Sequence, residues 1–442
     1  MYGPQGRRLT TPMSRRGVLG LGGGAALAGM LAACSGNSAS GGGDDEIGGT
    51  VRFAWWGNAQ RQEVYTQFAQ AFSEQEPEVT VQVEPAEYSA YLDRIAVQAG
   101  GRDLPDVFWL PANQVTSYAA NDVLLDVETL PSGVLDLSAI PADQVDSWRI
   151  DGVLNALVYS QYSPAIQIDT TALSDVGIDG VPDDESWDWD DFMALAQEYA
   201  DAAGDGNWGI ATQASFYQHA HMWIRQQGAE VFDQEGNIGF DEAVLADWYQ
   251  FWQDGIDAGA VMPPEITAGQ TQWTQTNHQT ALYMVQLNQF ADNAGFSQGH
   301  DLQLAKYPVA PSAGEDYQFH YYTRIPISAV TENAATAGAF VDYMLNDPSG
   351  AEMVGLASGI PVNPDVVDAI RDLGDETDLK IIEMQDRIDQ QPMRLRPEPP
   401  PAGADWQSLI EDTADNIFNG GQPIGDAVAA GMADLQRQLD RG

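Results

Sequence analysis

Strand and helix patterns alternate between residues 50 and 110, and this alternation constrains the fold more than any other feature. Apolar residues recur with strand or helix periodicity in the order strand, helix, strand, helix, strand, at residues 50–56, 60–74, 79–83, 88–99 and 106–110. Strands that alternate with helices form a mostly parallel sheet covered by helices. The sequence therefore predicts an α/β fold.

The residues that follow these strands are the first candidates for a binding site, because ligands of such sheets bind beyond the carboxyl ends of the strands. Tryptophan and tyrosine present flat faces to sugar rings, while amides and carboxylates bond to hydroxyl groups. For Glu87 and Tyr88, an exposed loop is an equally good interpretation, and for each tryptophan the alternative is packing in the core. The candidates are Trp56, Asn58, Glu87, Tyr88, Trp109 and Asn113.

The amino terminus has the layout of an export signal. A basic start is followed by a Gly/Ala-rich apolar run, and the pair Arg15-Arg16 is typical of twin-arginine signals. The run ends in Leu-Ala-Ala-Cys, which resembles a lipobox, so we expect cleavage after residue 33 and lipidation of Cys34. The glycine-rich residues 34–49 would then form a flexible tether. An uncleaved membrane anchor is the alternative.

Charge and cysteine content exclude several classes of function. The formal charge is −46, with 65 acidic residues, so nucleic acid is not an expected partner and anionic ligands are disfavoured. Cys34 is the only cysteine, which excludes intramolecular disulfides and cysteine-based metal clusters. The length exceeds what one core usually supports, so we expect two lobes.

Ordered motifs along the chain resemble those of family 1 extracellular solute-binding proteins, the sugar-binding lipoproteins of ABC transporters. The resemblance spans nearly the whole chain after the tether. It is carried by the Trp-Trp-Gly strand end, by Ser186 and the Trp-Asp-Trp-Asp-Asp-Phe that follows it, and by the runs at 101–107, 325–330, 339–345 and 359–363. Ser186 is the expected N-cap of the helix that follows it.

The resemblance implies a two-lobed periplasmic-binding-protein-like fold of type II. Each lobe would be a mainly parallel sheet flanked by helices, and a multi-strand hinge would join them. Lobe 1 is expected at residues 50–158 and 325–350, and lobe 2 at 159–324 and 351–442. The expected protein is a monomer without cofactors, anchored by lipid to the outer face of the cell membrane, which delivers a neutral sugar to the permease subunits of the transporter.

The resemblance also implies ligand-binding residues in the second lobe and near the hinge. The run at 215–219 is expected to be a loop, as is the run at 286–289, where relatives often carry a stacking tryptophan. Arg324 is expected either to bind ligand or to pair with an acidic residue and lock the closed lobes. The expected residues are Phe216, Tyr217, His219, Asn288, Tyr321, Tyr322, Arg324 and Trp406.

No motif of a catalytic site or metal centre occurs in the sequence. His219 and His221 stand two apart, so a surface or ligand-contact role is favoured over metal binding. A secreted glycoside hydrolase is the alternative class, since its cleft also combines acidic and aromatic residues. A binding protein of the same fold for a peptide, a polyol or a glycerophosphodiester is a further alternative.

Overall fold

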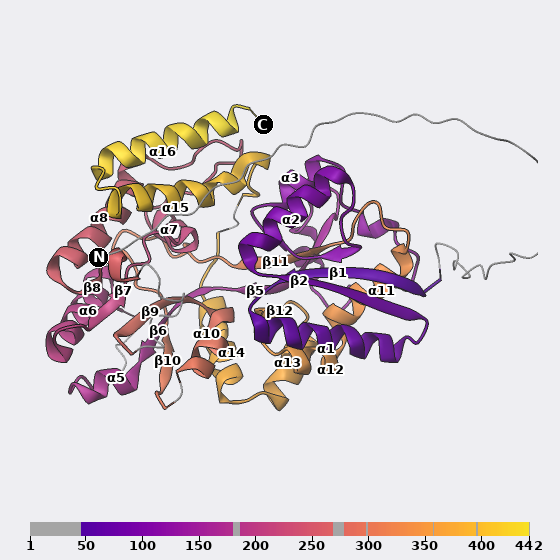
Figure 1. Cartoon of the computed structure of the whole chain (residues 1–442), viewed down its shortest axis with the longest axis horizontal. Coiled ribbons are helices and arrows are strands. Elements are labelled where there is room, and N and C mark those ends of the chain that lie inside the picture. Colours follow the sequence, from indigo (N-terminus) through magenta and orange to yellow (C-terminus); the bar gives the residue numbers. More distant parts are fainter. Residues whose placement is uncertain are drawn as a thin grey trace, which may run out of the picture. The chain divides into compact units, whose positions relative to one another are not determined.

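The computed structural model describes residues 46–179, 186–267, 278–297, 299–356, 358–394 and 397–441. The expected signal peptide (1–33), Cys34 and the tether up to residue 45 lie outside the described residues. Three sheets with surrounding helices make up the described part (Figure 1). No helix in these described ranges combines the length and the apolar character that a membrane span needs.

The first sheet is fully parallel and has the order β2-β1-β3. It consists of β1 (Gly49–Trp56), β2 (Val79–Ala86) and β3 (Val107–Phe108), with α1 (Ala59–Gln75) and α2 (Tyr88–Gly101) as the crossovers. The strand predicted at 106–110 is divided in the structure. The chain turns at Trp109, whose backbone N–H and carbonyl both bond to the Tyr91 hydroxyl (3.0 and 2.8 Å), and β4 (Leu110–Pro111) joins another sheet.

The second sheet is mixed and has the order β10-β6-β9-β7-β8. Its strands are β6 (Pro164–Asp169), β7 (Trp208–Ala211), β8 (Val261–Met262), β9 (Thr280–Gln286) and β10 (Leu302–Ala305). The pairs β7–β8 and β7–β9 are parallel, whereas β6 runs antiparallel to both β9 and β10. The first sheet is therefore parallel throughout and the second is divided between the two kinds of pairing.

The third sheet is antiparallel and links two separate cores. It has the order β12-β5-β11-β4, with β5 (Ala156–Tyr162), β11 (Tyr321–Pro326) and β12 (Ile360–Pro361). Leu157 and Ile325 belong to the core around the first sheet, whereas Tyr321 belongs to the core around the second. Both long strands thus run from one core to the other, as a hinge requires.

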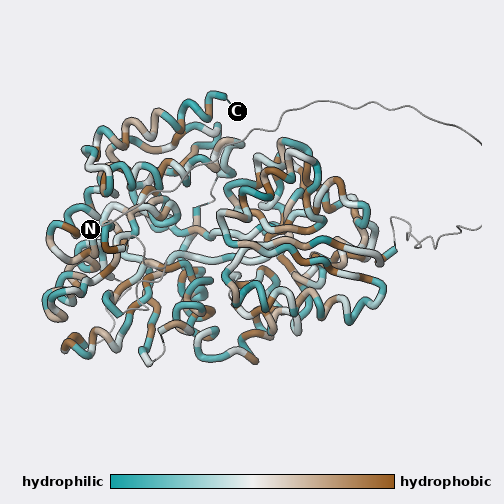
Figure 2. The backbone as a smooth tube through the Cα atoms, in the orientation of Figure 1, coloured by the Kyte–Doolittle hydropathy of each residue, from teal (hydrophilic) through white to brown (hydrophobic). Residues whose placement is uncertain are grey.

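Helices cover the sheets, and hydrophilic and hydrophobic stretches alternate along many of them (Figure 2). A third apolar cluster packs α13 (Pro364–Leu373) and α14 (Glu376–Asp389) against the second sheet. The remaining helices are α3 (Val115–Ala120), α4 (Ala142–Asp146), α5 (Thr170–Asp175), α6 (Trp189–Ala203), α7 (Tyr217–Gln226), α8 (Glu242–Ala258), α9 (Pro264–Thr267), α10 (Leu287–Phe296), α11 (Ala334–Asn346), α12 (Pro348–Val354), α15 (Asp405–Phe418) and α16 (Ile424–Leu439), with 3₁₀ turns at Val127–Thr129 and Pro401–Ala404.

Three local predictions are wrong at helix starts. Asp188, and not Ser186, caps α6, because its carboxylate accepts from the backbone N–H of Asp190 and Asp191 while the Asp191 side chain bonds back. The run at 215–219 is a loop only up to residue 216, since Tyr217 begins α7. The run at 286–289 is likewise the end of β9 and the first turn of α10.

The packing of α6 on β7 generates a stability prediction. A Cβ atom added at Gly209 would lie 2.2 Å from the backbone of Ala196, and helix backbone cannot yield as a flexible side chain can. We expect Gly209→Ala to lower the free energy of unfolding by about 2–4 kcal/mol. Gly100→Ala in α2 is the matched control, because its Cβ would meet nothing within 4 Å. Urea denaturation measures both, and equal stabilities would contradict the prediction.

Candidate functional site: a cavity at the strand ends

A cavity of about 630 Å³ opens at the carboxyl ends of strands from the first and second sheets. Its lining includes residues at or just after the ends of β1, β2, β7 and β9, together with one face of α15. The volume lies in the range of small-molecule sites. Seven of the residues expected to bind ligand line it: Trp56, Asn58, Glu87, Tyr88, Phe216, Tyr217 and Asn288.

Trp56 forms an aromatic wall of the cavity and is held from behind by other rings. Its ring meets those of Tyr88, Tyr91 and Trp109 edge to face at centroid distances of 5.1–5.6 Å. Trp109 itself is 1% exposed and does not line the cavity. A ring fixed on several edges presents its free face without further loss of side-chain entropy, which suits stacking against a flat ligand.

Asn58 joins the two walls of the cavity. Its side-chain oxygen accepts from the backbone N–H of Arg61 and so caps α1, while its amide nitrogen donates to Asp292 of α10 (3.1 Å). The Arg61 guanidinium lies 3.8 Å from the same carboxylate. Burial raises the pKa of Asp292, and the charge of Arg61 together with the hydrogen bond from Asn58 offsets part of this rise.

On the opposite wall, Phe216 and Tyr217 stand at the start of α7. Phe216 stacks on the ring of His219 (centroids 5.5 Å apart), and His219 is hydrogen-bonded to the Tyr307 hydroxyl at 2.6 Å. His219 is 1% exposed and lies behind the wall, outside the cavity lining. Its place in the core shows that the surface interpretation of His219 and His221 is wrong, since both rings are buried.

Side-chain amides at the end of β9 and in the first turn of α10 line the cavity and have polar atoms without a hydrogen-bond partner. Gln286 is 4% exposed, and its side-chain NH₂ group is buried without a partner. The side-chain oxygen of Asn288 is also buried without a hydrogen-bond partner. Buried polar atoms without partners are costly, so a ligand that bonds to them gains more than one that replaces existing bonds.

The cavity also has a wall that the sequence did not predict. Glu411, Asp415 and Phe418 of α15 line it, as do Arg61 and Asp292. The spacing of the three α15 residues places them on one helical face. Acidic residues on a helix face that points into solvent have the same spacing, so the sequence does not distinguish the two cases. The charged groups of the lining are four carboxylates (Glu87, Asp292, Glu411 and Asp415) and one guanidinium.

The other expected site residues lie outside the main cavity. Asn113, Tyr321 and Trp406 line a small neighbouring cavity, with Tyr217 shared between the two. Tyr322 packs on the first core and under the guanidinium of Arg324. Arg324 is 1% exposed and pairs with Glu398 at 3.0 Å, so it has the acidic partner that one of its two expected roles requires.

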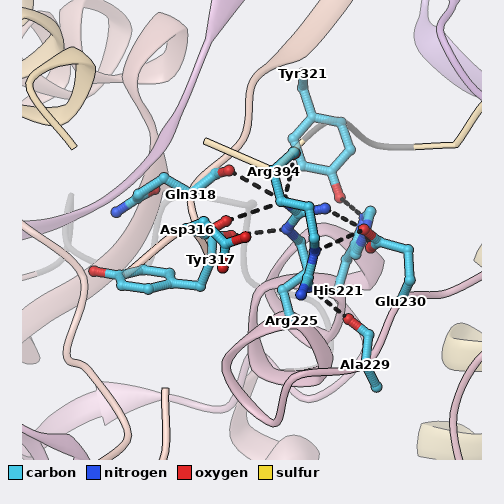
Figure 3. Close-up of polar contacts among 9 residues, drawn as sticks. All are labelled: His221, Arg225, Ala229, Glu230, Asp316, Tyr317, Gln318, Tyr321 and Arg394. Atoms are coloured by element: carbon cyan, nitrogen blue, oxygen red, sulfur yellow. Dashed lines mark hydrogen bonds and ion pairs between the residues drawn. The ribbon is translucent and has the colours of Figure 1, made fainter. Parts of the chain in front are cut away.

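A buried polar network supports the small cavity (Figure 3). Arg225 pairs with Glu230 and donates to the carbonyls of Tyr317 and Arg394 (2.8 and 2.7 Å). His221 lies between Glu230 (2.8 Å) and the Tyr321 hydroxyl (3.0 Å). Although burial alone would raise the pKa of Glu230, these neighbours lower it. The network therefore ties α7 to the start of β11 and fixes the position of Tyr321.

A comparison with protein families identifies the chain. The family described as bacterial extracellular solute-binding protein matches residues 67–377. The chain belongs to this family. Its members bind solutes for ABC transporters outside the cytoplasm and are not enzymes, which confirms the non-enzymatic prediction and removes the glycoside hydrolase alternative.

Solved structures of solute-binding proteins share the two-lobed α/β fold. A periplasmic solute-binding protein from Pectobacterium atrosepticum has a TM-score of 0.77 at 19% identity, covering 89% of this chain and 99% of the other. An oligogalacturonide-binding protein from Yersinia enterocolitica has 0.77 at 17%, covering 88% and 99%. The GacH receptor of Streptomyces glaucescens, solved with acarbose, has 0.74 at 18%, covering 89% and 99%. The predicted fold class is confirmed.

The buried histidine behind the cavity wall generates a pH prediction. Burial lowers the pKa of His219 to about 3, so the ring stays neutral in the fold while the unfolded chain takes up a proton below about pH 6.5. Proton uptake by the unfolded state alone lowers stability as the pH falls. We therefore expect His219→Gln to lose less stability than the parent protein between pH 6.5 and 4.5. Melting temperatures across this range test it, and parallel curves would contradict it.

Proposed function

We propose that this solute-binding protein takes a neutral sugar or oligosaccharide into the 630 Å³ cavity. The observation that carries the proposal is the lining itself. Aromatic faces at Trp56 and Phe216 stand on opposite walls, and the unpartnered side-chain NH₂ group of Gln286 lies at the end of β9 in the second sheet. Rings for C–H faces and amides for hydroxyls match the chemistry of a saccharide.

Relatives with this fold support a saccharide in preference to other solutes. The Streptomyces receptor was solved with acarbose, the Yersinia protein with saturated digalacturonic acid, and a Listeria monocytogenes protein with cycloalternan. The charges of this cavity select among such ligands. Four carboxylates against one guanidinium would repel a galacturonate, so the proposed ligand carries no negative charge.

The proposed lobes are residues 50–158 with 325–350 and residues 159–324 with 351–442. The two apolar cores support this division as far as residue 350, because one gathers residues from 51–159 and 325–345 and the other gathers residues from 166–321 and 406–435. Val354 and Val362, which the division assigns to the second lobe, pack in the first core. The strands β5 and β11 would then be the hinge. The hydrogen bond between Asn58 and Asp292 would hold the two walls together when the lobes are closed about these strands. The protein would act as a monomer that delivers the bound solute to the permease subunits.

We also propose export by the twin-arginine route and anchoring through Cys34, on the basis of the amino-terminal sequence. A diacylglycerol on Cys34 with a further acyl chain would hold the protein stably at the outer face of the membrane. The tether to residue 49 would leave the binding fold free to meet its transporter.

The saccharide proposal is tested by a thermal-shift screen of the protein against neutral mono-, di- and oligosaccharides, digalacturonate, polyols and short peptides. Binding to the folded state raises the melting temperature by mass action. We expect the largest shift from a neutral saccharide and none from digalacturonate. Trp56→Ala should weaken the dissociation constant of the best ligand at least about tenfold, because it removes a stacking face.

Two variants serve as controls for that screen. Trp56→Phe keeps a ring at the platform and should retain most of the affinity. Phe296→Ala removes an aromatic ring that is 50% exposed outside the cavity and should leave binding unchanged. A peptide or polyol as the best ligand, or equal affinity in Trp56→Ala and Phe296→Ala, would contradict the proposed saccharide site.

The anchor is tested in cells that process lipoproteins. We expect the chain to incorporate a labelled fatty acid and to partition into detergent, and Cys34→Ala to do neither, because no other cysteine is present. Mass spectrometry of the amino-terminal peptide identifies the modified residue. Detergent partitioning that persists in Cys34→Ala would indicate an uncleaved anchor instead.

A further inference from the structure

Two histidines and a buried carboxylate meet at the end of the second sheet that lies away from the cavity. Asp169 ends β6, and His278 and His300 precede β9 and β10, the two strands that pair with it. The potential ligand atoms of the three side chains all lie within 4.8 Å of one another. Gln286, at the other end of β9, lines the cavity, so the two sites occupy opposite ends of one strand.

The polar contacts of this triad are incomplete. Asp169 is fully buried, and its Oδ1 accepts from the backbone N–H of Ala172, which leaves Oδ2 facing both imidazoles. His300 Nδ1 lies 2.7 Å from Oδ2 and makes a hydrogen bond with it. His278 Nδ1 lies 3.7 Å away and is buried without a hydrogen-bond partner. Among the described residues, no lysine or arginine is paired with this carboxylate.

The backbone of His278, the residue with the unpartnered ring, has an unusual conformation. His278 adopts a left-handed conformation with a φ of 52°, which residues other than glycine seldom occupy. The two imidazoles are stacked at a centroid distance of 3.6 Å.

We propose that Asp169, His278 and His300 form a binding site for a divalent transition-metal ion of the zinc class. Two imidazole nitrogens and one carboxylate oxygen are a donor set that Zn²⁺ accepts, with a water molecule as the fourth ligand. Ligand atoms around a tetrahedral Zn²⁺ lie about 3.3 Å apart, given bonds of about 2.0–2.1 Å. The observed separations of 2.7 and 3.7 Å bracket this value.

An ion can reach this site and has room to bind. The side chains of His278 and His300 are 34% and 20% exposed, so the rings have space to separate as the ion enters between them and Oδ2. The bound ion would cross-link the end of β6 to the starts of β9 and β10 and would stabilise the second sheet. This proposal is independent of the saccharide proposal, because the two sites share no residue.

The test is Zn²⁺ binding to the full chain after removal of metals with a chelator. Isothermal titration calorimetry should show one saturable ion per chain, and the melting temperature should rise with Zn²⁺ concentration. We expect His278→Gln and His300→Gln each to weaken the affinity at least about tenfold. The test uses the histidine variants and no Asp169 variant, because Asp169 also caps α5 and its replacement would affect the fold.

Two control variants separate the triad from the acidic surface. Asp175→Asn removes an exposed carboxylate from α5, and His320→Gln removes a histidine outside the triad; both should bind Zn²⁺ as the parent protein does. Co²⁺ gives a second measurement on the parent protein alone, and Zn²⁺ should displace its visible ligand-field bands. Absent or non-saturable binding, equal affinity in the triad and control variants, or a Co²⁺ spectrum of the hydrated ion would overturn the proposal.

Discussion

The antiparallel pairing of β5 with β11 is the constraint on which the rest of the structure depends. It aligns segments that lie far apart in the sequence, from Ala156↔Pro326 at one end to Tyr162↔Tyr321 at the other, across a register shift next to Arg324. One end packs in the core of the first sheet and the other in the core of the second. The backbone pairing of these two strands therefore links the two cores, and the polar network around Arg225 fixes the position of Tyr321 at one end of the pair.

Local periodicity was sufficient to predict the first sheet and part of the site. Trp56 and Asn58 could be placed on the cavity because parallel strands end at one edge. The direction of each ring could not be predicted. Trp56 ends β1 and faces the cavity, whereas Trp109 follows β3 of the same sheet and is buried behind Trp56. The difference arises because the chain turns at Trp109 towards another sheet. The α15 wall was missed because acidic residues on a helix look the same whether they face a ligand or water.

The proposed metal site shows a stronger limit of sequence reasoning. His219 and His221, which stand two apart in the sequence, were predicted to lie at the surface or to contact ligand. Both rings are instead buried and hydrogen-bonded to tyrosines. His278 and His300 have no shared motif with Asp169, and only the register of β9 and β10 on β6 brings them together. Strand β9 begins just after His278 of the triad and ends at Gln286 in the cavity lining, an arrangement that a pattern of single residues could not reveal.

Hydrogen–deuterium exchange with and without the saccharide that binds most tightly tests the central claim most directly. A solute held between the walls should slow exchange at the start of α1, in residues 212–218, at the end of β9 and along α15, all of which line the cavity. Exchange around His278 and His300 should not change, because they lie at the far end of the sheet. Protection confined to one wall, or located away from the cavity, would contradict the account of a solute bound between two lobes.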